Sequence, residues 1–408
     1  MEHQVCIFTG ARPNFMKVAP IIRVITQTEG ISYRLVYAGS QADGTLEPSL
    51  FDDLQMPLPD VFLGVDCENL NELTGRVMAA FEDYLEHNAT DTVIVVDDLA
   101  STMAAAIVTK KRGLRLAHLV AGTRSFDISM PKEINRLVID GLSDLLFTAG
   151  PVSSSIATRE GAEMHKIYMV GNILMDTLRH QHNRWQRPAC LDGIADGRYL
   201  VLTVNRKALL ADTDNLQRML TAISDVAGDI PVIAPLRSPV SLVVSTLTDR
   251  LTLTEPLSYL EFGYLTSHAM GIITDSGNVA EEATFNHIPC ITLNSYTEHI
   301  ETVKQGTNVL VGEDAEQLRT NLQQLVAGQW KPGELPDRWD GRTAERIVQT
   351  LLTMNVENKK AVKPRLYDPE TGNYLNDATM KVIENARKGK DVIEVGSMDD
   401  YLKLNKDL

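Results

Sequence analysis

Short runs of apolar and β-branched residues alternate with segments of helical periodicity along most of this chain. Val5–Phe8 precedes a helical pattern over Phe15–Ile25, and Thr92–Val96 is apolar almost throughout. Continuous apolar strands separated by helices are typical of a parallel sheet covered on both faces. The same alternation restarts at Tyr199. The sequence therefore predicts an α/β protein with two doubly wound, Rossmann-like domains facing a cleft, and ligands in such sheets bind at the carboxyl ends of the strands.

The domain boundaries follow from changes in composition along the 408 residues. Residues 1–178 are expected to form an N-terminal Rossmann-like domain, and residues 179–198, which are polar and contain Trp185, Pro188 and two glycines, a linker. Residues 199–340 are expected to form the second domain. A helix over residues 341–354 is predicted to pack back on the first domain, and residues 355–408 form a C-terminal appendage.

Charge and cysteine usage exclude several classes of protein. The net charge of −15 argues against nucleic-acid binding, because phosphate repulsion would not be offset. Charged residues interrupt every apolar run before about 18 residues, so no membrane span is expected, and the first residues lack the basic region of a signal peptide. The four cysteines are scattered, without a CxxC pair. We therefore expect free thiols, a cytoplasmic location, no metal ion and no other cofactor.

Two loops have the composition of anion-binding turns. Gly10-Ala11-Arg12-Pro13 follows a strand and opens a helix, so Arg12 and the positive helix end suit a phosphate, with Lys17 just over one turn further on. A solvated loop arginine is the alternative. Thr274–Asn278 occupies the corresponding place in the second half and precedes Glu281 and Glu282. Its backbone N–H groups and Ser276 can hold a diphosphate, and an ordinary capped helix is the alternative.

These two loops belong to a longer pattern, which resembles the non-hydrolysing UDP-N-acetylglucosamine 2-epimerase family over roughly residues 4–353. The matching motifs are Gly10–Pro20, Arg124–Asp127, Met130–Arg136, Ser143–Thr148, Val170–Asn172, Glu255–Leu257, Thr274–Glu282 and Gly306–Gly312. The resemblance implies a glycosyltransferase-B-like arrangement and a homodimer. It also implies inversion at C2 of UDP-GlcNAc to give UDP-ManNAc, an isomerase reaction of polysaccharide biosynthesis, through elimination and re-addition of UDP.

The resemblance also assigns roles to individual residues. It implies catalytic roles for Asp98, Glu133 and Arg206. It also implies substrate binding by seven further residues. Arg12 and Lys17 would contact phosphate, Ser276 and Gly277 the diphosphate, and Glu282 the ribose. Asn135 and Arg136 would bind substrate beside Glu133.

Several positions depart from the family pattern. A family glutamate is Val120 here, a histidine is Asn205, an arginine is Asn294, and the glycine before Asp98 is Asp97, which is expected to crowd the pocket or repel phosphate. The Gly-Gln-His motif of the family becomes Gly39-Ser40-Gln41.

These departures bear directly on activity. Valine cannot titrate and asparagine cannot transfer a proton as a cation, and loss of one acid–base group commonly costs about 10²–10⁴-fold in rate. His118 and His299 are interpreted as packed or solvated residues. The sequence thus predicts a UDP-sugar-binding protein with impaired or altered epimerase activity. Three alternatives stay open: a non-catalytic nucleotide-sugar sensor or scaffold, an epimerase that takes its acid–base groups from elsewhere, and a glycosyltransferase sharing the fold.

The appendage has a faint resemblance of its own. Asn376–Lys403 is similar to the toxin-binding end of antitoxins in the RelB and DinJ group, with a short helix, a basic turn and a second short helix. This resemblance implies a protein partner that binds through residues 376–408. A packing or oligomerisation segment is the alternative.

Overall fold

The computed structural model describes residues 2–46, 48–358, 367–368, 373–374, 381 and 385. Two compact units are present, Met1–Leu352 and Thr353–Leu408, and both predicted α/β halves lie in the first. In the second unit, β14 (Tyr367–Asp368) pairs antiparallel with β15 (Asn373–Tyr374). Apart from Lys381 and Asn385, the predicted partner-binding segment 376–408 lies outside the described residues.

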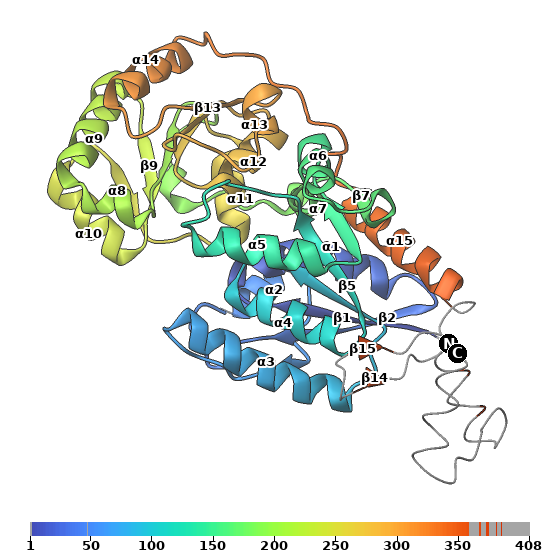
Figure 1. Ribbon diagram of the computed structural model, residues 1–408. Helices are drawn as coiled ribbons and strands as arrows, with labels where there is room; N and C mark the ends of the chain where they lie inside the picture. Colours follow the sequence, from blue (N-terminus) through green and yellow to red (C-terminus); the bar gives the residue numbers. More distant parts are fainter. Residues whose placement is uncertain are drawn as a thin grey trace, which may run out of the picture. The chain divides into compact units, whose positions relative to one another are not determined.

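The first lobe, coloured from blue to green in Figure 1, is built on a parallel sheet. Among the described residues this sheet has seven strands in the order β3-β2-β1-β4-β5-β6-β7. Its strands are β1 (His3–Thr9), β2 (Ile31–Tyr37), β3 (Val61–Phe62), β4 (Thr92–Val96), β5 (Arg115–Ala121), β6 (Leu145–Thr148) and β7 (Ile167–Met169). Its helices are α1 (Arg12–Thr26), α2 (Pro48–Leu54), α3 (Leu70–His87), α4 (Ala100–Lys111), α5 (Pro131–Leu142), α6 (Pro151–Arg159) and α7 (Ile173–Gln181). Strand order reverses between β1 and β4, the place where doubly wound sheets bind ligands.

The second lobe repeats the design with six described strands in the order β10-β9-β8-β11-β12-β13, all paired in parallel. The strands are β8 (Leu200–Thr203), β9 (Val232–Pro235), β10 (Thr252–Thr254), β11 (Gly271–Thr274), β12 (Cys290–Thr292) and β13 (Asn308–Leu310). The helices are α8 (Lys207–Ala211), α9 (Thr213–Ala227), α10 (Ser238–Leu247), α11 (Tyr259–Ser267), α12 (Gly277–Phe285), α13 (Glu301–Lys304) and α14 (Ala315–Val326). Its reversal lies between β8 and β11.

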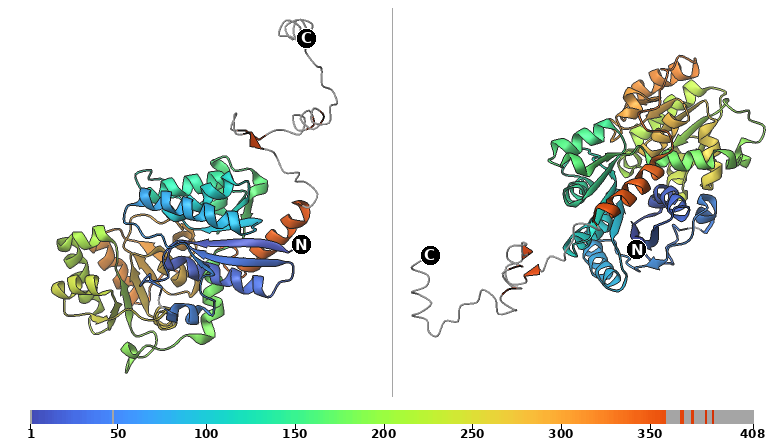
Figure 2. Two further views of the ribbon diagram at one scale, coloured as in Figure 1. Left: turned by 90° about the horizontal axis from the view of Figure 1, so that it is seen from below. Right: turned by 90° about the vertical axis from the view of Figure 1, so that its right-hand side faces the viewer.

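Each sheet buries both of its faces under helices (Figure 2). In β1, Cys6 and Phe8 face a core shared with α3 and α4, where Phe81 meets Phe8 edge-on with ring centroids 5.0 Å apart. The alternate residues Val5 and Ile7 are buried as well. Strands buried on both faces are expected to read as continuous apolar runs, which is why the sequence pattern was informative here.

Two crossing segments tie the lobes together within the first unit. The polar stretch after α7 contains short 3₁₀ turns at His182–Arg184 and Ala189–Leu191, and it leads into the second sheet. The chain returns through Trp339, which is fully buried and donates to the Ala149 carbonyl at 3.2 Å. Helix α15 (Thr343–Asn358) then begins against α7, because Asp176 accepts hydrogen bonds from the backbone N–H groups of Thr343 and Ala344.

Candidate functional site

The first strand-end turn, between β1 and α1, is organised by Asn14. The Asn14 side-chain oxygen accepts from the backbone N–H groups of Gly10 (2.9 Å) and Ala11 (3.1 Å). These two donors are therefore occupied within the protein. Any anion at this turn must depend on Arg12 at the start of α1 and on the remaining amides of the helix end.

Lys17, one turn further along α1, is paired inside the protein. Its ammonium lies 2.5 Å from the carboxylate of Asp97, which also accepts from the Asn14 side-chain amide at 2.8 Å. Burial would lower the pKa of Lys17, but Asp97 and Glu281 outweigh it and raise that pKa. The sequence suggested that Asp97 would crowd the pocket or repel phosphate. In the structure its negative charge is offset by the ammonium of Lys17.

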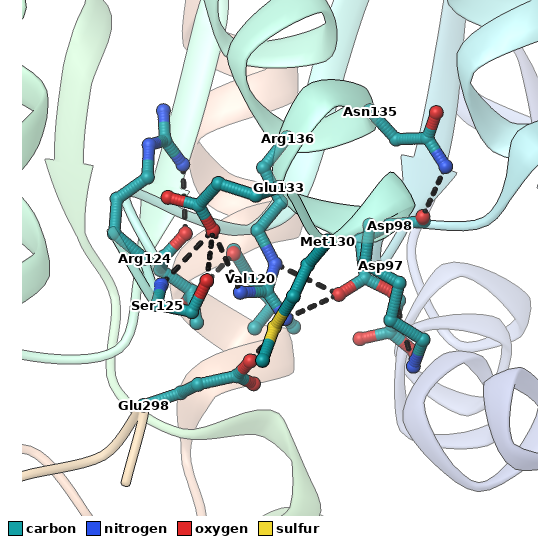
Figure 3. A network of polar contacts seen from close by, with 12 residues as sticks. Asp97, Asp98, Val120, Arg124, Ser125, Met130, Glu133, Asn135, Arg136 and Glu298 are labelled. Atoms are coloured by element: carbon teal, nitrogen blue, oxygen red, sulfur yellow. Dashed lines mark hydrogen bonds and ion pairs between the residues drawn. The ribbon is translucent and has the colours of Figure 1, made fainter. Parts of the chain in front are cut away.

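Asp98, at the same strand end, is held by α5. Arg136 donates to one carboxylate oxygen of Asp98 through Nη2 (2.5 Å) and Nε (2.8 Å), and Lys132 lies 3.6 Å from the other oxygen. Asn135 donates to the Asp98 carbonyl at 2.8 Å. Burial would raise the pKa of Asp98, but Arg136 and Lys132 outweigh it and hold the pKa below its ordinary value. Figure 3 shows the contacts of Arg136 and Asn135 with Asp98.

Glu133 is committed to the turn that precedes α5. Its carboxylate accepts from the Ser125 N–H (2.9 Å), the Ser125 hydroxyl (2.9 Å) and the Phe126 N–H (3.0 Å), and Arg136 lies 3.2 Å away. Burial would raise the pKa of Glu133, but these hydrogen bonds lower it overall. Its geometry suits holding the turn and Arg136 in place better than carrying a proton.

The second lobe reaches this cluster through the loop after β12. Glu298 accepts from Arg136 at 2.5 Å (Figure 3). The Tyr296 hydroxyl lies 3.8 Å from the sulfur of Met130, at the start of α5. The loop thus brings a carboxylate from one sheet to a guanidinium from the other.

A second cross-lobe contact lies beside Lys17. Glu281 of α12 accepts from the Asn172 side chain at 3.0 Å and lies 3.0 Å from the His299 ring. Burial raises the pKa of Glu281 despite His299 and Lys17. Its neighbour Glu282 is buried beside it, and burial together with the Glu281 charge raises the pKa of Glu282 to about 8.

The remaining predicted residues lie at the β8, β11 and β12 ends. Asp275 accepts from the backbone N–H groups of Asn205 (2.6 Å) and Arg206 (2.7 Å). The Arg206 side chain donates to Asn294 at 2.5 Å and lies 3.4 Å from Glu313. Ser276 precedes α12 but makes no side-chain capping hydrogen bond, so its hydroxyl is not used to cap the helix.

A cavity of about 210 Å³ opens between the lobes. Of the ten residues predicted for the site, Lys17, Asp98 and Arg136 line this cavity. The other seven are not among its lining residues, namely Glu133, Asn135, Arg206, Arg12, Ser276, Gly277 and Glu282. The wall also contains residues to which the sequence assigned no ligand role, namely Asp97, His118, Val120, Lys132, Asn278, Glu298 and His299. His118 and His299 are packed as expected, but at the cavity wall.

The sequence contained features that could have indicated some of these additional wall residues. Lys132 stands immediately before Glu133 in the Pro-Lys-Glu start of α5, and Asn278 lies inside the predicted anion loop. Glu298 had none, because its role depends on Arg136, 162 positions away. Within the described residues, no group of His, Cys, Asp or Glu side chains is arranged to hold a metal ion, and no helix is long and apolar enough to cross a membrane.

The family model described as UDP-N-acetylglucosamine 2-epimerase matches residues 23–352. This chain belongs to that family. It is 32% identical over 362 residues to a UDP-N-acetylglucosamine 2-epimerase of Methanocaldococcus jannaschii, covering 85% of this chain and 98% of the relative. It is also 31% identical over 356 residues to a UDP-2,3-diacetamido-2,3-dideoxy-D-glucuronate 2-epimerase of Pseudomonas aeruginosa, covering 85% and 98%.

Solved structures agree on the architecture of this family member. The M. jannaschii UDP-GlcNAc 2-epimerase in complex with UDP-GlcNAc and UDP superposes with a TM-score of 0.74 at 30% identity, covering 86% of this chain and 99% of that chain. The Neisseria meningitidis enzyme gives a TM-score of 0.77 at 23% identity, covering 86% and 100%, which supports the fold alone. The predicted glycosyltransferase-B-like arrangement of two Rossmann-like lobes is confirmed.

Proposed function

We propose that this family member binds a UDP-sugar between its lobes and acts at C2 of the sugar, as a 2-epimerase with altered and slowed catalysis. The observation that carries the proposal is the cavity wall. It combines Lys17, Lys132 and Arg136 with carboxylates at the switch point of the first sheet and receives Asn278 from the second lobe. Cations stabilise a diphosphate, and proton transfer needs a positioned acid or base, a role that a carboxylate can fill.

The UDP moiety is assigned to the start of α12. The first N–H groups of a helix have no partner inside the helix and bind anions readily. Ser276 keeps its hydroxyl out of the helix cap, and Gly277 leaves open space where a side chain would point. Glu282, one turn on, is assigned to the ribose hydroxyls. Asp275 of this loop accepts from the backbone N–H of Arg206 at the neighbouring strand end, which fixes the loop in place.

Catalysis is proposed to be altered because three polar groups of the family pattern are replaced by Val120, Asn205 and Asn294. Asn294 keeps a structural link, since it accepts from Arg206 and donates to the Asp275 carbonyl at 3.3 Å. Val120 and Asn205 offer no titrating group. Arg206 therefore keeps a partner at the end of β12. Proton transfer must depend on the titratable side chains that line the cavity.

The broader assignments rest on the family alone and stay proposals. They are a homodimer, a cytoplasmic location, a place in polysaccharide biosynthesis, and no need for a cofactor or metal. The net charge of −15 still argues against nucleic acid as a partner. The protein partner expected for residues 376–408 also stays a prediction.

The test is to incubate the protein with UDP-GlcNAc in D₂O and to follow deuterium at C2 and release of UDP by NMR. We expect deuterium to appear at C2 of the sugar. UDP binding is measured separately by calorimetry. Absence of UDP binding would overturn the ligand assignment, and exchange at the rate of an efficient epimerase would overturn the claim of slowed catalysis.

A non-catalytic sensor is the second candidate. It is favoured by the ion pair between Arg136 and Glu298, which joins the two lobes at the cavity wall. A ligand in the cavity can make or break this ion pair and so change how the lobes are held together. UDP binding without any C2 exchange would support the sensor and contradict the epimerase.

A further inference from the structure

Two neighbouring strand ends in the first sheet have unusual backbones. Val96 of β4 is paired with Leu119 of β5, so the next residues, Asp97 and Val120, stand side by side at the carboxyl edge. Both have left-handed conformations, with φ of 58° at Asp97 and 71° at Val120. Such a φ is uncommon for any residue with a side chain and costly for a β-branched one.

Buried hydrogen bonds of His118 and Asp140 hold these two strand ends in place. The His118 ring lies 2.5 Å from Asp140 through Nδ1 and 3.0 Å from the Asp97 carbonyl through Nε2. Asp140 also accepts from the Gly122 N–H at 3.0 Å, just beyond Val120. Strained backbones persist only where surrounding contacts over-determine them, and they gather at functional sites.

The bend at Asp97 delivers a carboxylate to the cavity wall beside Lys17. Two other carboxylates line that wall, Asp98 and Glu298, and both are bound to Arg136, which cannot give up its proton. Asp98 also has Lys132 at 3.6 Å, and its pKa is lowered. Asp97 instead contacts an amide and an ammonium, and its neighbour Val120 gives the cavity an apolar side.

Resting on the function proposed above, we propose that Asp97 is the catalytic base that removes the C2 proton of the bound sugar. Position 120 has lost its carboxylate, and the adjacent strand supplies one at the neighbouring register position. The replacement of a glycine by Asp97 is then a relocation of the base rather than an obstruction.

The step balances without a co-reactant. Asp97 takes the proton from C2, the C–H electron pair forms the C1–C2 double bond, and the C1–O bond breaks with its pair leaving on the diphosphate of UDP. Lys17 compensates the Asp97 anion before the transfer. Exchange of the Asp97 proton with D₂O followed by reversal of the step places deuterium at C2, so the measurement does not require inversion.

The experiment compares the wild type with Asp97→Asn, Asp97→Glu, Asp97→Gly, Asp97→Gly/Val120→Glu and the exposed control Asp229→Asn. Asp97→Asn is expected to slow C2 exchange by about 10²-fold or more while UDP affinity stays within about threefold. Asp97→Glu retains part of the exchange, because its carboxylate is displaced by one methylene. The double variant is expected to recover at least about tenfold over Asp97→Gly, since a carboxylate returns from the neighbouring strand.

The outcomes separate this inference from the function on which it rests. Exchange by Asp97→Asn at the wild-type rate would overturn the assignment while leaving the epimerase function intact. Exchange lost in Asp97→Asn together with UDP affinity, with no recovery in the double variant, would show a purely structural role and also overturn it. If the wild type binds UDP without exchange, or binds no UDP, the proposed function fails and this inference fails with it.

Discussion

Arg136 of the first lobe donates to Glu298 of the second at 2.5 Å, while its other nitrogens contact Asp98 and Glu133. One guanidinium thus joins three carboxylates from a strand end, its own helix and the opposite lobe. The Arg136 side chain is 5% exposed and that of Glu298 is 31% exposed. Because Arg136 is buried and Glu298 is partly exposed, substitutions of the two residues should change the free energy of unfolding by different amounts.

Arg136→Gln is expected to lower the free energy of unfolding by about 3–5 kcal/mol, because it removes the buried guanidinium that the carboxylates of Asp98 and Glu133 share. Glu298→Gln is expected to cost at most about 1 kcal/mol, since its partner keeps two other carboxylates and the side chain is partly solvated. Urea unfolding at pH 7 measures both. Equal losses for the two variants would contradict the view that the contact across the cleft is the minor part of this cluster.

Much of the fold could be read from the sequence because both sheets are parallel and buried. The predicted helical pattern over Phe15–Ile25 lies within α1, and the apolar strand predicted at Thr92–Val96 has the bounds of β4. Helix α10 was missed, since Ser238–Leu247 is rich in valine and serine and lacks the polar face of a surface helix. Val240 and Val244 pack into the core of the second lobe, and this packing offsets the low helix propensity of valine.

The site was less readable, because its contacts join segments that the sequence keeps apart. The Lys17 and Asp97 pair depends on β1 and β4 lying side by side, although β2 and β3 intervene in the chain. The sequence gives the types of these residues but not their partners. It therefore suggested repulsion at Asp97, where the structure has an ion pair.

Gly277 provides a test of ligand approach that does not disturb the fold. A Cβ added at Gly277, the first residue of α12, meets no atom within 4 Å. Gly277→Ala is therefore expected to leave the melting temperature unchanged or slightly raised, while weakening UDP binding by about tenfold.

The matched control is Gly75, an exposed residue of α3, where an added Cβ also meets nothing within 4 Å. Gly75→Ala should leave UDP affinity unchanged, as measured by calorimetry. Unaltered affinity in Gly277→Ala would remove the diphosphate from this loop.

Asp176 joins α7 to the start of α15. Its carboxylate accepts from the Thr343 N–H (3.0 Å) and the Ala344 N–H (2.8 Å), and it is buried. Asp176→Ala is expected to cost about 1–3 kcal/mol in unfolding free energy at pH 7, because two buried donors lose their acceptor. Asp176→Asn should lose less, since its side-chain oxygen can still accept. The exposed Asp229→Ala serves as control and is expected within about 0.5 kcal/mol of wild type.

Glu282 should make the stability of the ligand-free protein depend on pH. Burial and the Glu281 charge raise its pKa from 4.5 to about 8. A carboxyl group whose folded pKa lies above its unfolded pKa holds a proton that unfolding releases, so its contribution to stability is greatest below about pH 4.5 and falls as the pH rises towards 8. Glu282→Gln cannot ionise and lacks this loss. The melting temperature of the variant relative to wild type should therefore rise between pH 5 and pH 8. A difference in melting temperature that stays constant with pH would show that Glu282 is ionised in the folded protein throughout.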